Sequence, residues 1–95
     1  MIAYVGLLKT KKGKRDEYIQ KLLKSEMINI FRKQDGNVYY EIAKSETDED
    51  MVVVTDGWVD MNAFILHDTC NTVKEIWKPL EREYVVAMKG YILKE

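Results

Sequence analysis

The sequence of 95 residues contains only one cysteine, one histidine and one proline. Because Cys70 is alone, it cannot form an internal disulfide, which fits a reducing compartment, and we expect a cytoplasmic protein. A single proline and an apolar content of 46% exclude a disordered or linker-rich chain. A lone histidine without further ligands also argues against a metal site, which needs three or four ligands.

The chain also lacks an excess of charge of either sign. Fifteen basic residues nearly balance sixteen acidic ones, so no net field attracts nucleic acid or an anionic membrane. The one basic segment, Lys9 to Arg15, contains no aromatic residue that could stack on bases, and it is typical of a solvated loop. The apolar segment Ile2 to Leu8 is far too short for a membrane span and lacks the features of a signal peptide. We therefore expect neither nucleic acid nor a membrane as a partner.

Hydrophobic periodicity divides the chain into alternating strands and helices within one domain, residues 1–95. Alternating or continuous apolar residues predict strands, and apolar residues at steps of three and four predict amphipathic helices. Asp60 is the expected N-cap of one helix, and Pro79 should loosen another. The predicted elements are a strand over 2–8, a helix over 14–33, strands over 37–44 and 51–58, helices over 61–67 and from 70 to about 83, and a strand over 84–93.

This β-α-β-β-α-β order predicts an α+β, ferredoxin-like fold with a four-stranded antiparallel sheet and both helical layers on one face. The first, third and fourth strands carry large apolar residues on both faces, yet the helices can cover only one face. A monomer would expose a wide apolar patch. We therefore expect two copies to pair through their sheet faces as a symmetric homodimer.

Trp58 and His67 lie nine positions apart, where an apolar strand leads into a helix. Trp58 can be a core anchor beneath the helices, or it can line a cavity with its indole N–H directed at a ligand. His67 can end a helix, where the helix dipole favours it, or it can act as a general base near neutral pH.

Other side chains also allow two interpretations. Tyr4, Tyr39 and Tyr40 can pack across strands or project phenols into a cavity. Cys70 follows Thr69, a possible N-cap, so it can be a small buried hydrophobe or a thiol whose pKa the helix dipole lowers. Four methionines are predicted to be core residues, namely Met27, Met51, Met61 and Met88.

Four segments in this order resemble the antibiotic biosynthesis monooxygenase family. They are the strand, Lys/Gly turn and helix of "MIAYVGLLKTKKGKRDEYI", the turn into a strand of "QDGNVYYEI", the strand, Trp, short helix and His of "VVVTDGWVDMNAFILH", and an apolar last strand. The resemblance covers nearly the whole chain. It implies a ferredoxin-like subunit that pairs into a dimeric α+β barrel.

The family includes cofactor-independent oxygenases of quinols and phenols, haem-degrading enzymes and isomerases of small phosphorylated signals. Many members have a second histidine about five residues after the first, where this chain has Asn71 or Thr72. Haem-degrading relatives carry an asparagine on the first strand, and Ile2 to Leu8 contains none.

The resemblance thus implies a cofactor-independent monooxygenase that acts on a small aromatic, phenolic or quinol substrate between sheet and helices. His67 is then the candidate catalytic residue, and Trp58, Tyr4, Tyr40 and Asn71 are candidates for substrate binding. The alternative is a non-catalytic dimer that binds a small apolar ligand or serves a stress or signalling role. Haem degradation is a third possibility.

Overall fold

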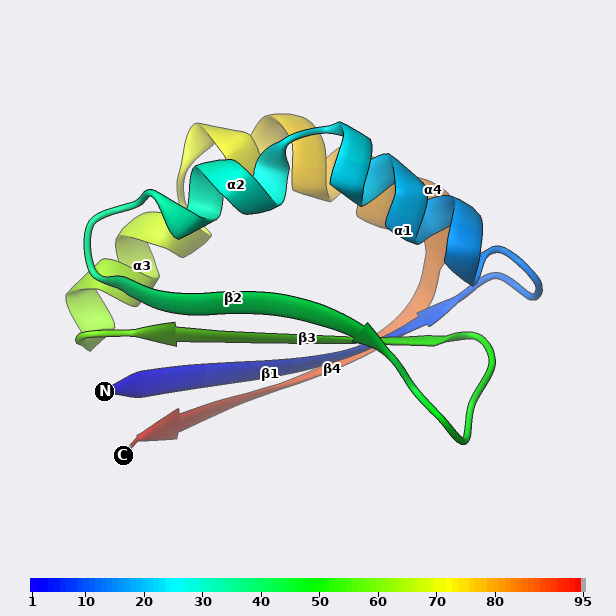
Figure 1. Ribbon diagram of the computed structural model, residues 1–95, viewed down its shortest axis with the longest axis horizontal. Coiled ribbons are helices and arrows are strands. Elements are labelled where there is room, and N and C mark those ends of the chain that lie inside the picture. The colour runs from blue at the N-terminus through cyan, green and yellow to red at the C-terminus, as the bar shows by residue number, and fades with distance from the viewer. Residues whose placement is uncertain (95) are drawn as a thin grey trace.

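The computed structural model describes residues 1–94; residue 95 of the predicted domain lies outside the described residues. Its strands are β1 (Ile2–Thr10), β2 (Asn37–Lys44), β3 (Met51–Trp58) and β4 (Val85–Lys94), and they form one antiparallel sheet in the order β2-β3-β1-β4. Its helices are α1 (Arg15–Lys24), α2 (Met27–Arg32), α3 (Met61–Asp68), the π-helical segment η1 (Val73–Trp77) and α4 (Lys78–Tyr84). All of them lie on one face of the sheet, which confirms the predicted ferredoxin-like α+β fold (Figure 1).

The core lies between the helices and every second residue of the central strands. On β3, Val52, Val54, Asp56 and Trp58 are each at most 2% exposed. On β2, Tyr40 is 4% exposed, whereas Val38, two residues earlier, is 53% exposed. The pairing of β2 with β3 shifts between Asn37 and Tyr39, and this irregularity takes Val38 out of the alternation.

The predicted continuous helix over 14–33 was wrong, because two helices occupy this range. The break is at Glu26, whose φ of 64° is left-handed and cannot continue a right-handed helix. Ser25 stabilises the break, since its hydroxyl donates to the carbonyl of Leu22 and accepts from the N–H of Met27. Serine competes in this way with the backbone bonds of a helix.

The connection from α3 to α4 confirms one predicted cap and corrects another. The carboxylate of Asp60 accepts a hydrogen bond from the N–H of Ala63 at 2.8 Å, as expected of an N-cap. Thr69 is instead the C-cap of α3, and its hydroxyl donates to the carbonyl of Ile65. Cys70 therefore lies in the turn between the helices, half-buried against the core.

The π-helical segment η1 ends two residues before Pro79, the residue predicted to loosen this helical run. Proline lacks an N–H, and its ring crowds the carbonyl four residues earlier, so a regular α-helical turn is unfavourable here. The wider turn accommodates the proline without ending the helical run.

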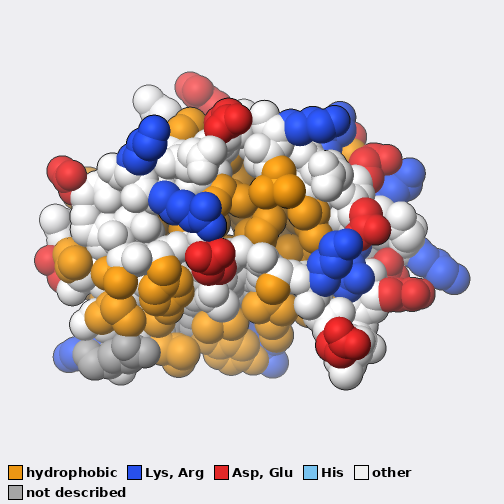
Figure 2. All heavy atoms as spheres, in the orientation of Figure 1, with side chains coloured by type: hydrophobic (Ala, Val, Ile, Leu, Met, Phe, Trp, Pro, Cys, Tyr) orange, Lys and Arg blue, Asp and Glu red, His pale blue; other side chains and the backbone are white. Residues whose placement is uncertain are grey.

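The face of the sheet away from the helices is apolar, as the strand pattern predicted. Val5, Leu7 and Val53 are half-buried there, and Tyr91 and Leu93 are 43% and 48% exposed. Figure 2 shows hydrophobic side chains gathered along this side of the molecule. The predicted pairing of two sheet faces stays a prediction.

Two of the four methionines assigned to the core were misplaced. Met27 is fully buried and Met51 is half-buried, but Met61 and Met88 are 42% and 51% exposed. Met61 opens α3 at the margin of the helical layer, and Met88 lies on the edge strand β4, where the helices give little cover.

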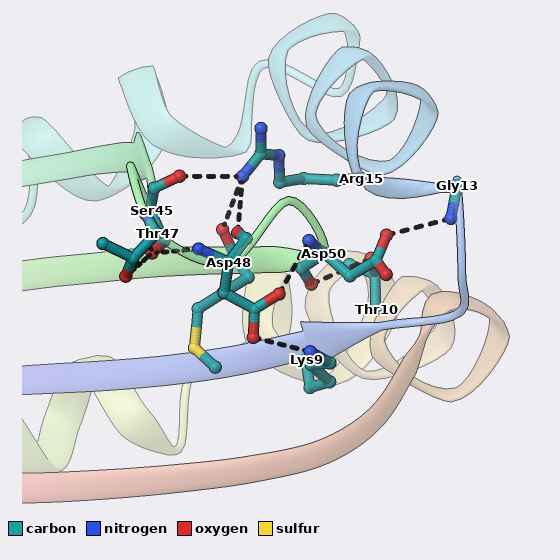
Figure 3. A network of polar contacts seen from close by, with 9 residues as sticks. Lys9, Thr10, Gly13, Arg15, Ser45, Thr47, Asp48 and Asp50 are labelled. Atoms are coloured by element: carbon teal, nitrogen blue, oxygen red, sulfur yellow. Dashed lines mark hydrogen bonds and ion pairs between the residues drawn. The ribbon is translucent and has the colours of Figure 1, made fainter.

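The charged loop between β2 and β3 is held by Lys9 near the end of β1 and Arg15 at the start of α1 (Figure 3). Nη1 of Arg15 donates to the carbonyls of Ser45, Asp48 and Met51 at 3.1, 2.9 and 3.3 Å. Nζ of Lys9 forms an ion pair with Asp48 at 2.5 Å. Two basic side chains of the Lys9 to Arg15 segment therefore make intramolecular contacts.

Within the part of the chain that the structure describes, no helix is both long enough and apolar enough to cross a membrane.

Candidate functional site

A row of four residues crosses the sheet and faces the helices. Tyr40, Asp56, Tyr4 and Ile92 are register partners on β2, β3, β1 and β4 in turn. Together with α3, η1 and α4 they border a cavity of about 280 Å³. The remaining lining residues are Leu8, Phe31, Val54, Phe64, His67, Asp68, Val73, Trp77, Lys78, Glu81 and Met88.

Asp56 is the most deeply placed charged group of this cavity, since only 1% of the residue is exposed. Its Oδ2 accepts a hydrogen bond from the indole N–H of Trp58 at 2.7 Å. Burial raises the pKa of Asp56 to about 6; the bond from Trp58 lowers it and the charge of Asp68 raises it further. Asp56 is therefore a carboxyl group that titrates close to neutral pH.

His67 is held by aromatic rings and one amide. Trp58 stacks on its ring with centroids 4.5 Å apart, and Phe31 meets it edge-on at 4.5 Å. Nδ1 of His67 lies 2.9 Å from Oε1 of Gln34, so the amide oxygen accepts when Nδ1 carries the proton. Burial lowers the pKa of His67 to about 4, although the negative charge of Asp68 acts in the opposite direction. The imidazole is consequently neutral near pH 7.

The two tyrosines of the row keep their protons. Burial, and next the charge of Asp56, raise the pKa of Tyr4 and Tyr40 above the usual value. Tyr4 lies over two register-paired glycines, Gly6 and Gly90, where a side chain on Gly90 would meet the Tyr4 hydroxyl at 2.5 Å. The absence of side chains at both glycines thus makes room for the Tyr4 ring.

The wall of the cavity across from the sheet, formed by α3, η1 and α4, is acidic. The indole N–H of Trp77 donates to Oε1 of Glu81 at 3.2 Å, and Asp68 lines the same wall. Lys78 is the one lysine or arginine among the lining residues. Over residues 1–94, no cluster of three or more histidine, cysteine, aspartate or glutamate side chains is arranged to hold a metal ion.

The profile of the antibiotic biosynthesis monooxygenase family matches residues 1–78 of the chain. The chain belongs to this family. No curated protein matches it. Among solved structures, a protein from Shewanella oneidensis superposes with a TM-score of 0.88 at 22% identity, over 99% of this chain and 89% of that one.

Two further solved structures share the fold. A conserved protein from Methanosarcina mazei gives a TM-score of 0.87 at 20% identity and covers 99% of this chain and 91% of its own. A protein described as an antibiotic biosynthesis monooxygenase gives a TM-score of 0.84 at 13% identity, and the match covers 100% of this chain and 98% of that one. At these identities the likeness shows the fold of the family and leaves the substrate open.

The structure brings only part of the predicted site to the cavity of this family member. Tyr4, Tyr40 and His67 line it. Trp58 does not, because it lies fully buried beneath His67 and gives its N–H to Asp56. Asn71 is exposed and lies outside the lining set, so the structure does not bring it to the cavity.

The sequence-based assignment missed Asp56 as a site residue. A signal was present, since Asp56 interrupts the buried alternation of Val52, Val54 and Trp58 with a charged residue. A charge at such a position is costly unless it is paired or functional.

A second hollow, of about 450 Å³, lies between the α1–α2 layer and the edge strand β2. Figure 2 shows a hydrophobic patch there, to which Leu23, Ile28 and Ile42 contribute. Its charged residues are exposed, and two of them, Arg32 and Glu41, form an ion pair at 3.1 Å. Without a buried titratable group, this groove offers less for catalysis than the cavity around Asp56.

Proposed function

We propose that this family member is a cofactor-independent monooxygenase that acts on a small phenol or quinol in the cavity. The observation that supports the proposal best is that Asp56 and a neutral His67 line the same aromatic-walled cavity. Phe31, Tyr40 and Phe64 supply the flat apolar walls that an aromatic ring requires.

In such a reaction the substrate provides the electrons. A quinol reacts with dioxygen so that one oxygen atom enters the ring and the other leaves as water, which gives a hydroxyquinone. Removal of the hydroxyl proton makes the ring electron-rich enough to reduce dioxygen. The protein must therefore supply a dry cavity, an acceptor for the proton and groups that orient the ring.

Two side chains of the cavity can accept that proton. His67 is the candidate from the sequence. Its Nε2 has no hydrogen-bond partner within residues 1–94 and is not fully enclosed by them, so it remains accessible. Asp56 is the candidate that the structure adds. Burial favours the neutral form of each group, so it makes Asp56 a stronger proton acceptor and His67 a weaker one.

The proposal is tested by aerobic incubation with a panel of quinols in an oxygen electrode, with mass analysis of the product. We expect dioxygen uptake without accumulation of hydrogen peroxide, and a product heavier by one oxygen and lighter by two hydrogens. His67→Ala should slow uptake at least tenfold, as expected for loss of a general base or of its positioning. Leu66→Ala, on the exposed side of α3, is the matched control. No uptake by the wild-type protein across the panel would refute the proposal.

The alternative is a non-catalytic protein that binds a small apolar or aromatic molecule in the same cavity. The specific observation in its favour is the absence of the second histidine, since Asn71 and Thr72 occupy that region. Saturable binding of quinols without any dioxygen uptake would select this alternative.

We also propose a homodimer formed through the sheet faces away from the helices. The exposed Tyr91 and Leu93 and the half-buried Val53 on this face support it, because a monomer would leave them in water. Light scattering should give twice the mass of the chain, and Val53→Lys should shift the protein toward the monomer. A wild-type monomer at all concentrations would contradict the pairing.

A further inference from the structure

We infer that Asp56 accepts the hydrogen bond, and then the proton, of a ligand hydroxyl, and that the cavity consequently takes uncharged hydroxylated aromatic compounds and rejects aromatic carboxylates. The inference rests on the proposed function for its proton step and on the geometry of the cavity for its selectivity.

The first support is that only one of the two carboxylate oxygens of Asp56 is engaged in a hydrogen bond. Oδ2 is held by the indole N–H of Trp58 at 2.7 Å, which fixes the carboxylate on its strand. Oδ1 accepts no hydrogen bond from residues 1–94. It is also not fully enclosed by them, so a ligand can reach it. Since Asp56 lines the cavity, Oδ1 is the free acceptor that a ligand hydroxyl would meet.

The second support is the comparison with His67. Its Nδ1 is engaged by Gln34, and its ring is packed between Trp58 and Phe31 with no carboxylate hydrogen-bonded to it. An imidazolium formed there would be a buried cation without a partner. Asp56 becomes neutral on accepting the proton, so the transfer moves one negative charge from Oδ1 to the ligand oxygen and creates no additional buried charge, whereas transfer to His67 would create a cation and an anion. The step moves one proton from the ligand oxygen to Oδ1 and leaves a bound phenolate or quinolate.

The third support is the charge around the cavity. Asp56, Asp68 and Glu81 line it together with a single lysine, Lys78. A ligand carboxylate would lie among like charges, and Oδ1 of Asp56 could offer it no hydrogen. An uncharged phenol instead donates to Oδ1 while its ring contacts Phe64 or Trp77. Like-charge opposition is how sites commonly reject a near-identical competitor.

Binding tests the selectivity, because Trp77 lines the cavity and reports occupancy by fluorescence. The wild-type protein should bind hydroquinone at least tenfold more tightly than 4-hydroxybenzoate. Asp56→Asn preserves an oxygen that can accept from Trp58 but loses the charged acceptor. It should therefore weaken the binding of hydroquinone about tenfold and reduce the preference for hydroquinone over 4-hydroxybenzoate. Asp35→Asn, the same change at an exposed position, should alter neither affinity. Equal affinities of the wild-type protein for both ligands, or an unchanged preference in Asp56→Asn, would overturn the inference.

The pH dependence of turnover tests the proton step. The groups facing Asp56 are Tyr4 from β1, Tyr40 from β2, His67 and Asp68 from α3, and Lys78 and Glu81 from α4. If Asp56 is the acceptor, the fall of the turnover rate at low pH disappears in Asp56→Asn and persists in His67→Gln. The reverse pattern would assign the step to His67 and overturn the inference while leaving the oxygenase proposal intact. Selective binding without turnover would refute the oxygenase and retain Asp56 as the selectivity residue.

Discussion

Trp58 donates its indole N–H to Asp56 from two positions further along the same strand, and the two atoms lie 2.7 Å apart. Residues two apart on a strand point to the same face, so this bond needs no long-range folding event to form. The fully buried indole thereby stabilises a carboxylate, which in turn satisfies the only hydrogen-bonding group of the indole. Each buried polar group therefore depends on the other.

Trp58→Phe removes the donor but keeps an aromatic ring against His67. We expect the free energy of unfolding to fall by about 1.5–3 kcal/mol at pH 7.5, where Asp56 is ionised, because a charged acceptor loses its partner. At pH 5 the carboxyl is mostly protonated and the loss should shrink to about 1 kcal/mol. Urea unfolding at both pH values measures this. Trp77→Phe, whose bond to Glu81 is only part-buried, is the control; equal losses of Trp58→Phe at both pH values would contradict the expectation.

The pH dependence of stability should show two opposing contributions. The pKa of Asp56 is raised to about 6, so its contribution is full at low pH and is lost as the pH rises from about 4 through 6. The pKa of His67 is lowered to about 4, so its contribution is full above pH 6.5 and is lost as the pH falls toward 4. Each of these two contributions is worth on the order of 3 kcal/mol. In the wild-type protein the two therefore nearly cancel between pH 4 and 6.5.

Single substitutions should expose each contribution. Asp56→Asn leaves His67 unopposed, so the variant should lose stability as the pH falls from 6.5 to 4, relative to the wild-type protein. His67→Gln should gain stability over the same interval. Thermal unfolding at a series of pH values measures both, with Asp35→Asn as the reference. Parallel curves for all four proteins would show that neither group is perturbed as the structure indicates.

Gly90→Ala should disturb Tyr4 specifically. A Cβ at this position would meet the Tyr4 hydroxyl at 2.5 Å, whereas one at Gly6 would meet the same ring at 3.1 Å. We expect Gly90→Ala to cost about 1–3 kcal/mol through overpacking, and Gly6→Ala to cost less. In a Tyr4→Ala background the cost of Gly90→Ala should largely vanish, and a double-mutant cycle measures this coupling. An unchanged cost would mean that the strand backbone, and not Tyr4, resists the methyl group.

Glu26→Gly should stabilise the protein. The φ of 64° at Glu26 costs a non-glycine residue about 1–2 kcal/mol, part of which glycine's greater freedom in the unfolded chain offsets. We expect a net gain of about 0.5 kcal/mol in urea unfolding, even though the side-chain contact with Asn29 is lost. Lys24→Gly, inside the last turn of α1, should instead lower stability by up to about 1 kcal/mol. A loss in Glu26→Gly would show that the Asn29 contact outweighs the backbone strain.

The strands and the face that the helices cover follow from patterns within single segments, so the sequence predicts them. The alternation along β3 and the cap at Asp60 needed no knowledge of the rest of the chain. The break at Glu26 was missed because the apolar periodicity runs through it, from Leu22 to Met27. Periodicity reports which residues are buried, and it is insensitive to one residue of left-handed backbone.

The site was harder to predict than the fold because it depends on register between distant strands. Nothing local indicates that Asp56 lies opposite both Tyr40 and Tyr4, from segments about 16 and 52 positions earlier. The resemblance directed attention to His67 and Trp58, yet it could not show that the indole N–H of Trp58 donates its hydrogen bond to Asp56. Asn71 was chosen by spacing to a missing histidine, and spacing alone does not place a side chain in a cavity.

The π-helical segment η1 has a consequence for how this cavity could have arisen and how it could be lost. A π turn holds one residue more than the α-helical turn it replaces, so it can be viewed as a single-residue insertion that the helix absorbed. Deleting one residue from Val73–Trp77 would restore the regular repeat and rotate the following residues by about 100° relative to the preceding ones. Trp77 and Glu81 would then be carried away from the cavity wall together. A length change of one codon is therefore enough to rebuild or erase the acidic wall while leaving the sheet untouched.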